Sequence, residues 1–346
     1  MSDGAQAARN LDALDGLRGF AALLVMFGHM GNWGLFFEIR GAGQLGVMIF
    51  FALSGFLMAY LYVDRTNGWQ GWAGYGIRRF MRVYPLYAFA ALFAFLMASL
   101  GYRWVYGPIG VEQLIELLTL EYWRSVWWTI PVEMKFYAVF PFIALGAAIL
   151  PDARWRIAYL LLLVLLGFSL GATAERTDLL RGLPFFLTGA LAGYLQQQIH
   201  TGAIRPPGWV APLCFALGAA GLVIVFPNMA AWIGWTPTLW LNPWSYAIGA
   251  ALLVFGTANT SGIAQALFAN PFARHLGFIS FSVYLFHIPV LNVVRRLDGP
   301  APVLFLLACL AVLLAANLTE RFVENPSRAL GSVWARKIAD LGGKSR

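Results

Sequence analysis

Two ionisable side chains, Arg18 and His29, lie eleven residues apart in the first hydrophobic stretch of the sequence. Eleven residues make almost three turns of α-helix, so both side chains fall on one stripe, about 16 Å apart along the axis. That distance is roughly half of the ~30 Å hydrocarbon thickness of a bilayer. An arginine at one membrane face would therefore share a groove with a histidine near the midplane, where ionisable groups are rare and mark functional sites.

A second candidate site is the basic cluster Arg78-Arg79-Phe-Met-Arg82-Val-Tyr84-Pro85. The spacings i, i+3 and i, i+4 place Arg82 on one helical face with each of the other two arginines. Guanidinium groups suit bidentate binding of phosphate, for example on a nucleotide or coenzyme A. The alternative is an anchor that binds anionic lipid. The use of arginine without lysine favours the phosphate ligand.

A third candidate is Glu133, within Trp128-Thr-Ile-Pro-Val-Glu133-Met-Lys135-Phe-Tyr137. Its carboxylate lies about five residues inside a predicted membrane span, roughly 7–8 Å deep. A carboxylate at that depth must be paired, protonated or close to water. Glu133 is therefore a candidate acid/base or a ligand of a substrate hydroxyl, and a structural bond to a neighbouring helix is the alternative. Lys135, two residues on, points to a different face.

A fourth candidate is His287, in Ser280-Phe-Ser-Val-Tyr284-Leu-Phe-His287-Ile-Pro289. It lies some eleven residues into its predicted span, and Tyr284 is one helical turn away. A single buried histidine is usually structural. Since the chain has only four histidines and two of them, His29 and His287, fall at the same predicted depth, a functional role is favoured.

The composition predicts an all-α, polytopic integral membrane protein. Of 346 residues, 60% are hydrophobic and 12% are charged, compared with roughly 25% charged in soluble domains. Apolar runs of spanning length recur along the whole chain, and they are too continuous for barrel strands. They predict about ten transmembrane helices, at approximately 17–36, 45–63, 85–101, 128–149, 156–173, 179–198, 209–226, 243–258, 276–295 and 301–321.

The distribution of basic residues predicts the orientation. With these spans, sixteen Lys and Arg residues fall on one side and seven on the other. The positive-inside rule then places both termini in the cytoplasm. The net charge of +8 is largely this signal, so it gives no reason to expect a nucleic-acid partner. Cys214 and Cys309 both fall within spans, so neither a disulfide framework nor a metal site is expected.

The chain is predicted to hold one membrane domain, residues 1–325, and a short basic cytoplasmic tail, residues 326–346. Near the end of the last span, Glu320 and Glu324 flank Arg321. We expect these carboxylates to form structural ion pairs.

Taken together, the motifs resemble acyltransferase family 3, the integral-membrane acyltransferases that modify bacterial cell-surface glycans. They occur in the family's order over almost the whole chain, from about residue 10 to 325. The matching segments are Leu14-Asp-Gly-Leu-Arg18-Gly with His29, Phe50-Phe-Ala-Leu-Ser-Gly-Phe56, Arg79-x-x-Arg82-x-Tyr84-Pro85, Trp128-Thr-Ile-Pro-Val-Glu133-Met-Lys-Phe-Tyr137 and Tyr284-Leu-Phe-His287-x-Pro289.

The resemblance implies a ten-helix domain in the bacterial cytoplasmic (inner) membrane. It implies transfer of an acyl group, usually acetyl, from cytoplasmic acyl-CoA to a hydroxyl of a cell-envelope sugar. It also implies that the Arg18/His29 pair and the arginine motif act in catalysis and donor handling. The chain departs from the usual Trp-Ser-Leu-x-x-Glu pattern at Thr129 and Pro131, and it adds Lys135. Some relatives carry a C-terminal esterase-like domain.

These observations give a hypothesis for the site. We expect the catalytic residues to be His29, Glu133 and His287, with His29 as general base or, less favoured, as transient acyl carrier. The residues expected to bind the donor are Arg18, Arg78, Arg79 and Arg82. The residues expected to bind the substrate are Trp128, Tyr137 and Tyr284.

Other functions share these features. A transporter or flippase would also place charges inside the membrane, but the internal symmetry and paired broken helices typical of transporters are not evident. A non-catalytic sensor or partner subunit is a third class. The sequence leaves open whether the acceptor is an envelope glycan (O-antigen, exopolysaccharide or peptidoglycan), a lipid-linked sugar or a secreted small molecule. It also leaves open the choice between acetyl, succinyl and longer acyl groups, direct transfer versus an acyl-enzyme, and the oligomeric state.

Overall fold

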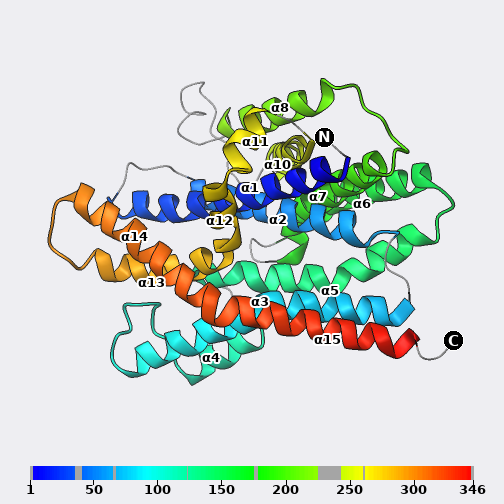
Figure 1. Ribbon diagram of the computed structural model, residues 1–346. Helices are drawn as coiled ribbons and strands as arrows, with labels where there is room; N and C mark the ends of the chain where they lie inside the picture. The colour runs from blue at the N-terminus through cyan, green and yellow to red at the C-terminus, as the bar shows by residue number, and fades with distance from the viewer. Residues whose placement is uncertain are drawn as a thin grey trace. The chain divides into compact units, whose positions relative to one another are not determined.

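The computed structural model describes residues 3–35, 41–64, 68–122, 124–174, 178–224, 243–259 and 262–343. Within these ranges all regular elements are helices, and no strand is present (Figure 1). This confirms the all-α class. The long helices are α1 (Asp3–Asn32), α2 (Ala42–Tyr62), α3 (Gly68–Ser99), α5 (Thr129–Ala148), α6 (Ala153–Thr173), α7 (Leu179–His200), α8 (Val210–Ile224), α10 (Pro243–Asn259), α13 (Ser280–Val294), α14 (Ala301–Thr319) and α15 (Asn325–Gly343). The short ones are α4 (Val111–Leu118), η1 (Ser125–Trp128), α11 (Ile263–Phe268), α12 (Pro271–Phe278) and η2 (Glu320–Glu324).

Several of these helices are long and apolar enough to cross a bilayer, as a multi-pass membrane protein requires. Among the described residues six helices meet this condition, or seven if α12 and α13, which are bent by 71°, form one broken span. The number is lower than the predicted ten for physical reasons. Helices α8 and α10 contain shorter apolar segments, Val210–Val223 and Tyr246–Asn259, while α7 carries Arg181 and three consecutive glutamines.

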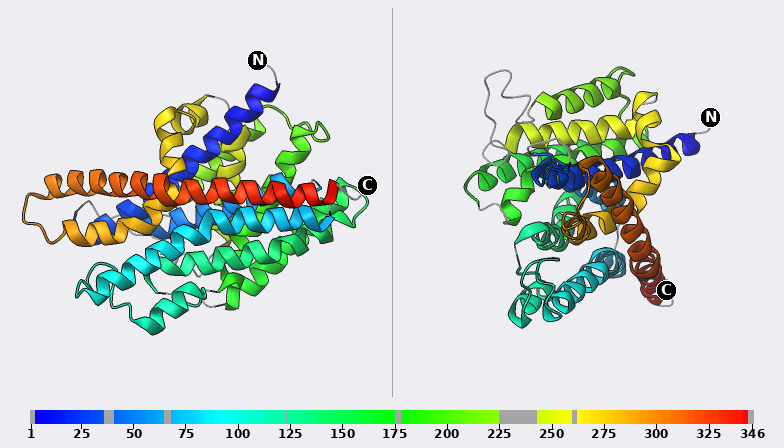
Figure 2. Two further views of the ribbon diagram at one scale, coloured as in Figure 1. Left: turned by 60° about the horizontal axis from the view of Figure 1, so that its bottom comes forward. Right: turned by 90° about the vertical axis from the view of Figure 1, so that its left-hand side faces the viewer.

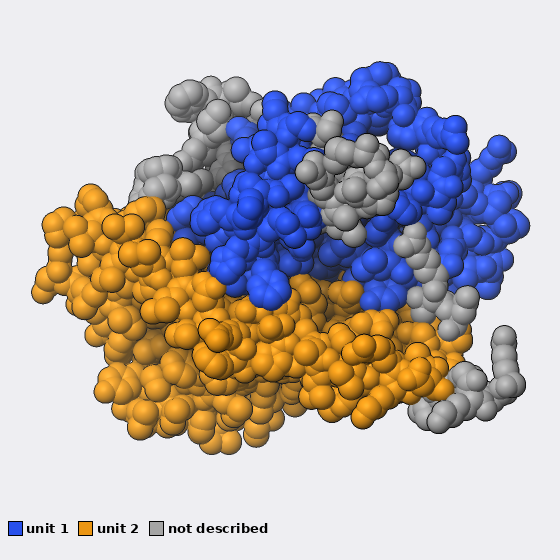
Figure 3. Space-filling model, in the orientation of Figure 1, with its two compact units in different colours: residues 1–28, 39–65, 142–280 blue, residues 29–38, 66–141, 281–346 orange. Residues whose placement is uncertain are grey.

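The chain forms two compact units (Figure 3). Unit 1 contains residues 1–28, 39–65 and 142–280, and unit 2 contains residues 29–38, 66–141 and 281–346. Of the ten predicted site residues, nine belong to unit 2, and Arg18 belongs to unit 1. Each unit is described below by itself.

In unit 1, helices α2 and α7 pack at backbone contact distance. Gly189 and Gly193, one turn apart on α7, face the backbone carbonyls of Ala52 and Phe56 on α2. Thr188 donates a hydrogen bond to the Ala247 carbonyl, 3.2 Å away, and so joins α10 to α7. Small residues at such crossings let membrane helices approach closely. Such close packing stabilises the pair, since lipid offers no hydrophobic force that would drive the helices together.

Substituting Gly189 by valine is expected to destabilise unit 1 strongly. An added Cβ would collide with the Ala52 carbonyl oxygen, and such overpacking costs about 3 kcal/mol of unfolding free energy. Thermal unfolding of the purified protein in lipid nanodiscs measures the effect. The control is Gly221→Ala on α8, where an added Cβ meets open space and the change should stay within about 1 kcal/mol. Equal stability of the two variants would contradict this packing.

In unit 2, the C-terminal helices form one long rod. Helix α14 passes through the π-helical turn η2 directly into α15 (Figure 2). Helix α15 packs along α3, where Gly331 lies against the side chain of Met81. The segment that the sequence analysis treated as a short basic tail is therefore helical as far as Gly343.

Candidate functional site

The two histidines predicted near the midplane lie against each other in unit 2. His29 Nδ1 on α1 is 3.4 Å from His287 Nε2 on α13, and the ring centroids are 5.0 Å apart. His287 is 0% exposed, whereas His29 is half-buried. Residues that are 258 positions apart in the sequence thus form one imidazole pair.

Hydrogen bonding defines the proton positions in this pair. His287 Nδ1 lies 2.7 Å from the Tyr284 carbonyl and 3.1 Å from the Val283 carbonyl. Carbonyls only accept, so Nδ1 carries the proton, and Nε2 of neutral His287 is an acceptor. His29 Nδ1–H must then be the donor between the rings, which leaves the lone pair of a neutral His29 on Nε2. This arrangement prepares His29 Nε2 to accept a proton.

Tyr284 connects α13, the helix that carries His287, to the start of α5. Its hydroxyl donates to the Val126 carbonyl at 2.8 Å and accepts from Thr129 Oγ1 at 2.8 Å. The Tyr284 and His287 rings have centroids 6.0 Å apart. Both partners of the Tyr284 hydroxyl lie at the junction of η1 and α5, so α13 is fixed against that junction.

A polar stripe runs along α5 from this junction. Thr129, Glu133 and Tyr137 follow at i, i+4 and i+8, so they share one face over about 12 Å. The Tyr137 hydroxyl donates to Glu133 Oε1, and Tyr75 OH donates to the Tyr137 carbonyl at 3.0 Å. Lys135 is exposed and lies off this stripe. Glu133 thus has a hydrogen-bond partner on its own helix. The structural alternative predicted from the sequence was a bond to a neighbouring helix.

The arginine cluster meets the far end of the stripe. Arg79 Cζ lies 5.8 Å from the centroid of the Tyr137 ring, in cation–π contact. Arg79 and Arg82 are half-buried on α3, and Arg78 is exposed. Trp128, which the sequence analysis assigned to substrate binding, is half-buried and directly precedes the stripe. Unit 2 therefore connects a cationic cluster to the histidine pair through the α5 stripe.

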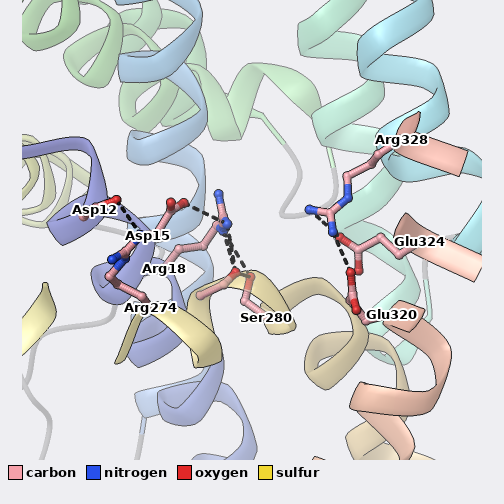
Figure 4. Close-up of polar contacts among 9 residues, drawn as sticks. Asp12, Asp15, Arg18, Arg274, Ser280, Glu320, Glu324 and Arg328 are labelled. Atoms are coloured by element: carbon pink, nitrogen blue, oxygen red, sulfur yellow. Dashed lines mark hydrogen bonds and ion pairs between the residues drawn. The ribbon is translucent and has the colours of Figure 1, made fainter. Parts of the chain in front are cut away.

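Arg18 has a separate environment in unit 1 (Figure 4). Its guanidinium donates to the Gly277 carbonyl at 2.8 and 3.1 Å and to Ser280 Oγ at 3.1 Å, and it pairs with Asp15 at 3.0 Å. Gly277 lies in the last turn of α12, where a cation stabilises carbonyls that lack helical partners. In this structure Arg18 holds the end of α12.

The buried acidic residues of η2 share one partner (Figure 4). Arg328 lies 2.8 Å from Glu320 and 3.7 Å from Glu324, and Ser282 donates to Glu324 at 3.1 Å. Both carboxylates thus form ion pairs, as expected from the sequence, and the partner is Arg328, which had not been predicted. The Glu320–Arg328 contact spans eight residues and a π-helical turn, so the helical i, i+4 rule does not predict it, whereas Glu324 and Arg328 do stand at i, i+4.

Sequence reasoning also missed Tyr106, in the segment between α3 and α4. Its hydroxyl donates to the Leu285 carbonyl on α13 at 2.8 Å. Burial raises the pKa of Tyr106 well above its ordinary value, so the hydroxyl stays protonated and remains a donor. Nothing in the local sequence indicates this contact, because the partner is 179 residues away. Thr129, in contrast, could have been identified as a site residue from the sequence, because it lies one helical turn before Glu133.

A comparison with protein families assigns the chain to a class of enzymes. The family model described as an acyltransferase domain (Acyl_transf_3) matches residues 11–320. The chain belongs to this acyltransferase family. It is therefore an enzyme that transfers acyl groups other than aminoacyl groups, and this confirms the resemblance seen in the motifs.

Individual relatives are distant in sequence. The chain is 26% identical over 371 residues to acyltransferase MdmB of Streptomyces mycarofaciens, with 92% of each chain covered. It is 22% identical over 374 residues to peptidoglycan O-acetyltransferase OatA of Listeria monocytogenes, covering 93% of this chain and 56% of OatA. The chain thus spans little more than half the length of OatA. No solved structure matches the chain.

Proposed function

We propose that this enzyme transfers an acyl group, acetyl in the first instance, from cytoplasmic acyl-CoA to a hydroxyl group of a cell-envelope or exported sugar. The observation that carries the proposal is the His29–His287 pair, joined within unit 2 to the α5 stripe and the arginine cluster. Family membership supports acyl transfer, and the relative described as a peptidoglycan O-acetyltransferase supports a glycan acceptor.

In this proposal His29 Nε2 is the general base. It takes the proton of the acceptor hydroxyl while the hydroxyl oxygen attacks the thioester carbonyl. The new O–C bond forms, the C–S bond breaks, and the coenzyme A thiolate leaves and takes up the proton that His29 received, which returns His29 to its neutral form. His287 accepts a hydrogen bond from His29 Nδ1–H, so it favours the tautomer required for the base and stabilises the imidazolium that forms.

The donor is proposed to bind through its phosphates. Arg78, Arg79 and Arg82 supply guanidinium groups for these phosphates. The role of Arg18 as a further donor ligand remains a prediction from the sequence, and its contacts with Gly277 and Ser280 give it a structural role as well.

The side chains of the α5 stripe are proposed to orient the reactants. Glu133 accepts a hydrogen bond from the acceptor sugar or acts as a second acid/base, and its bond from Tyr137 fixes the carboxylate. Trp128 offers an aromatic face to a sugar ring. Tyr284 holds His287 in place from the neighbouring turn.

We propose ten membrane spans for the topology, with both termini in the cytoplasm of a bacterial inner membrane. The positive-inside distribution supports this orientation. The ten predicted stretches also overlap helices α1, α2, α3, α5, α6, α7, α8, α10, α13 and α14.

Mass spectrometry of envelope glycans tests the function. Cells that carry the gene should contain glycans heavier by one acyl mass than cells in which it is deleted, and a copy with His29→Ala should resemble the deletion. The mass difference identifies both the acyl group and the acceptor. Identical glycans, combined with loss of export of an unmodified glycan in the deletion strain, would indicate a transporter and contradict the proposal.

A further inference from the structure

Two buried hydrogen-bond donors of unit 2 have no partner among the described residues. They are Tyr87 OH on α3 and Trp127 Nε1 in η1. Tyr87 is 0% exposed and Trp127 is 1% exposed, and their rings meet edge to face with centroids 5.6 Å apart. An unpaired buried donor loses its hydration without compensation, so native proteins rarely retain one. Two such donors on adjacent side chains indicate a ligand.

Tyr87 and Trp127 lie along the interface between α3 and the polar stripe of α5. Tyr87 follows Arg79 by eight residues, so both are on one face of α3, about 12 Å apart. Arg79 contacts Tyr137 at one end of this interface, and Tyr87 contacts Trp127 at the other. The two unpaired donors are thus at the end of the interface remote from the arginine cluster.

The same end of the interface is bonded to α13, the helix that carries His287. Trp127 packs against Tyr106 with ring centroids 5.1 Å apart, and Tyr106 OH donates to the carbonyl of Leu285, two residues before His287. Thr129, two residues after Trp127, hydrogen-bonds Tyr284 on the same helix.

Neighbouring tyrosines show that the state of Tyr87 is unusual. The hydroxyls of Tyr84, Tyr106 and Tyr284 each donate to a backbone carbonyl at 2.8 Å. The local backbone can therefore satisfy a tyrosine hydroxyl, yet it leaves that of Tyr87 without a partner among the described residues.

We propose that Tyr87 OH and Trp127 Nε1–H bind an oxygen atom of the substrate during acyl transfer. An indole N–H only donates, so the ligand must be a hydrogen-bond acceptor. In an acyl transfer two oxygens fit: the carbonyl oxygen of the acyl group and the hydroxyl oxygen of the acceptor. This inference rests on the proposed function, because it needs a substrate that reacts at the histidine pair.

Tyr87→Phe tests the proposal, because it removes only the hydroxyl. If the ligand is the acceptor hydroxyl, the KM for the acceptor should rise about tenfold, the value of one neutral hydrogen bond. If it is the acyl carbonyl, which gains negative charge in the transition state, kcat should fall about 10²-fold. Hydrolysis of acyl-CoA without acceptor should fall in the second case and stay constant in the first. In both cases the melting temperature should be unchanged or raised.

The matched control is Tyr106→Phe. This variant loses a hydroxyl that already has a protein partner, so its melting temperature should fall. Trp127→Phe is a second variant; it removes the indole N–H and should change kcat or KM in the same direction as Tyr87→Phe.

Unchanged kcat and KM in Tyr87→Phe would overturn the inference. If the melting temperature of that variant were then higher than that of wild type, Tyr87 OH would be an unpaired donor without function. If it were lower, the hydroxyl would bind a structural water. A wild-type protein that transfers no acyl group would instead contradict the proposed function itself.

Discussion

Replacing His29 by alanine is expected to lower acyl transfer by about 10²–10⁴-fold, the contribution of a general base. The variant should still fold and insert, because His29 is half-buried and its contact with His287, at 3.4 Å, is a long hydrogen bond. Transfer by purified protein in nanodiscs, with size-exclusion profiles as the check on folding, measures this effect. His200→Ala and His275→Ala are matched controls at exposed positions, and their rates should equal that of wild type.

The partner histidine should show non-additive behaviour. His287→Ala is expected to reduce transfer less than His29→Ala does, because His287 acts only on the base. The double variant should be no slower than His29→Ala alone, as for residues that act as one unit. Additive losses from the two substitutions would contradict the tautomer assignment, and a wild-type rate in His29→Ala would contradict the general base.

Substituting the arginine cluster should weaken donor binding. Arg79→Ala and Arg82→Ala are each expected to raise the KM for acyl-CoA about 10- to 100-fold, since each removes a charge-assisted hydrogen bond to phosphate. kcat should change far less. Steady-state kinetics with acyl-CoA and a fixed acceptor concentration measures both constants.

A donor without phosphates separates phosphate binding from lipid anchoring. An acyl thioester of N-acetylcysteamine keeps the reactive group but lacks the nucleotide, so its KM should be the same for wild type and both arginine variants. Arg336→Ala, at an exposed position on α15, is the control for general charge. If the KM for acyl-CoA stays at the wild-type value in Arg79→Ala and Arg82→Ala, the cluster is a lipid anchor.

Local patterns were sufficient to predict the fold class and much of the candidate site. Apolar runs set the positions of the long helices before α15, because each helix in a membrane must satisfy its own backbone. Ionisable residues at predicted depth selected His29, Glu133 and His287, since burying such groups needs a specific reason. The prediction could not supply the contact between the two histidines, which depends on tertiary packing.

Features that depend on distant partners were not predictable. The sequence predicted one span over 276–295, whereas helices α12 and α13 meet at 71°. Arg18 hydrogen-bonds Gly277 at this break, 259 residues away, and no local pattern encodes that contact. Residues after Asn325 lack an apolar run, yet α15 is helical, because one face of it packs on α3.

Photo-crosslinking of the donor tests the central claim that the acyl group reaches the histidine pair. An acyl-CoA analogue with a diazirine in its acyl chain would be irradiated with the purified protein in nanodiscs, and labelled peptides would be identified by mass spectrometry. We expect labels around His29, Thr129 and His287, and competition by unlabelled acyl-CoA should remove them. Competable labelling confined to other helices, with none at these three positions, would contradict the account.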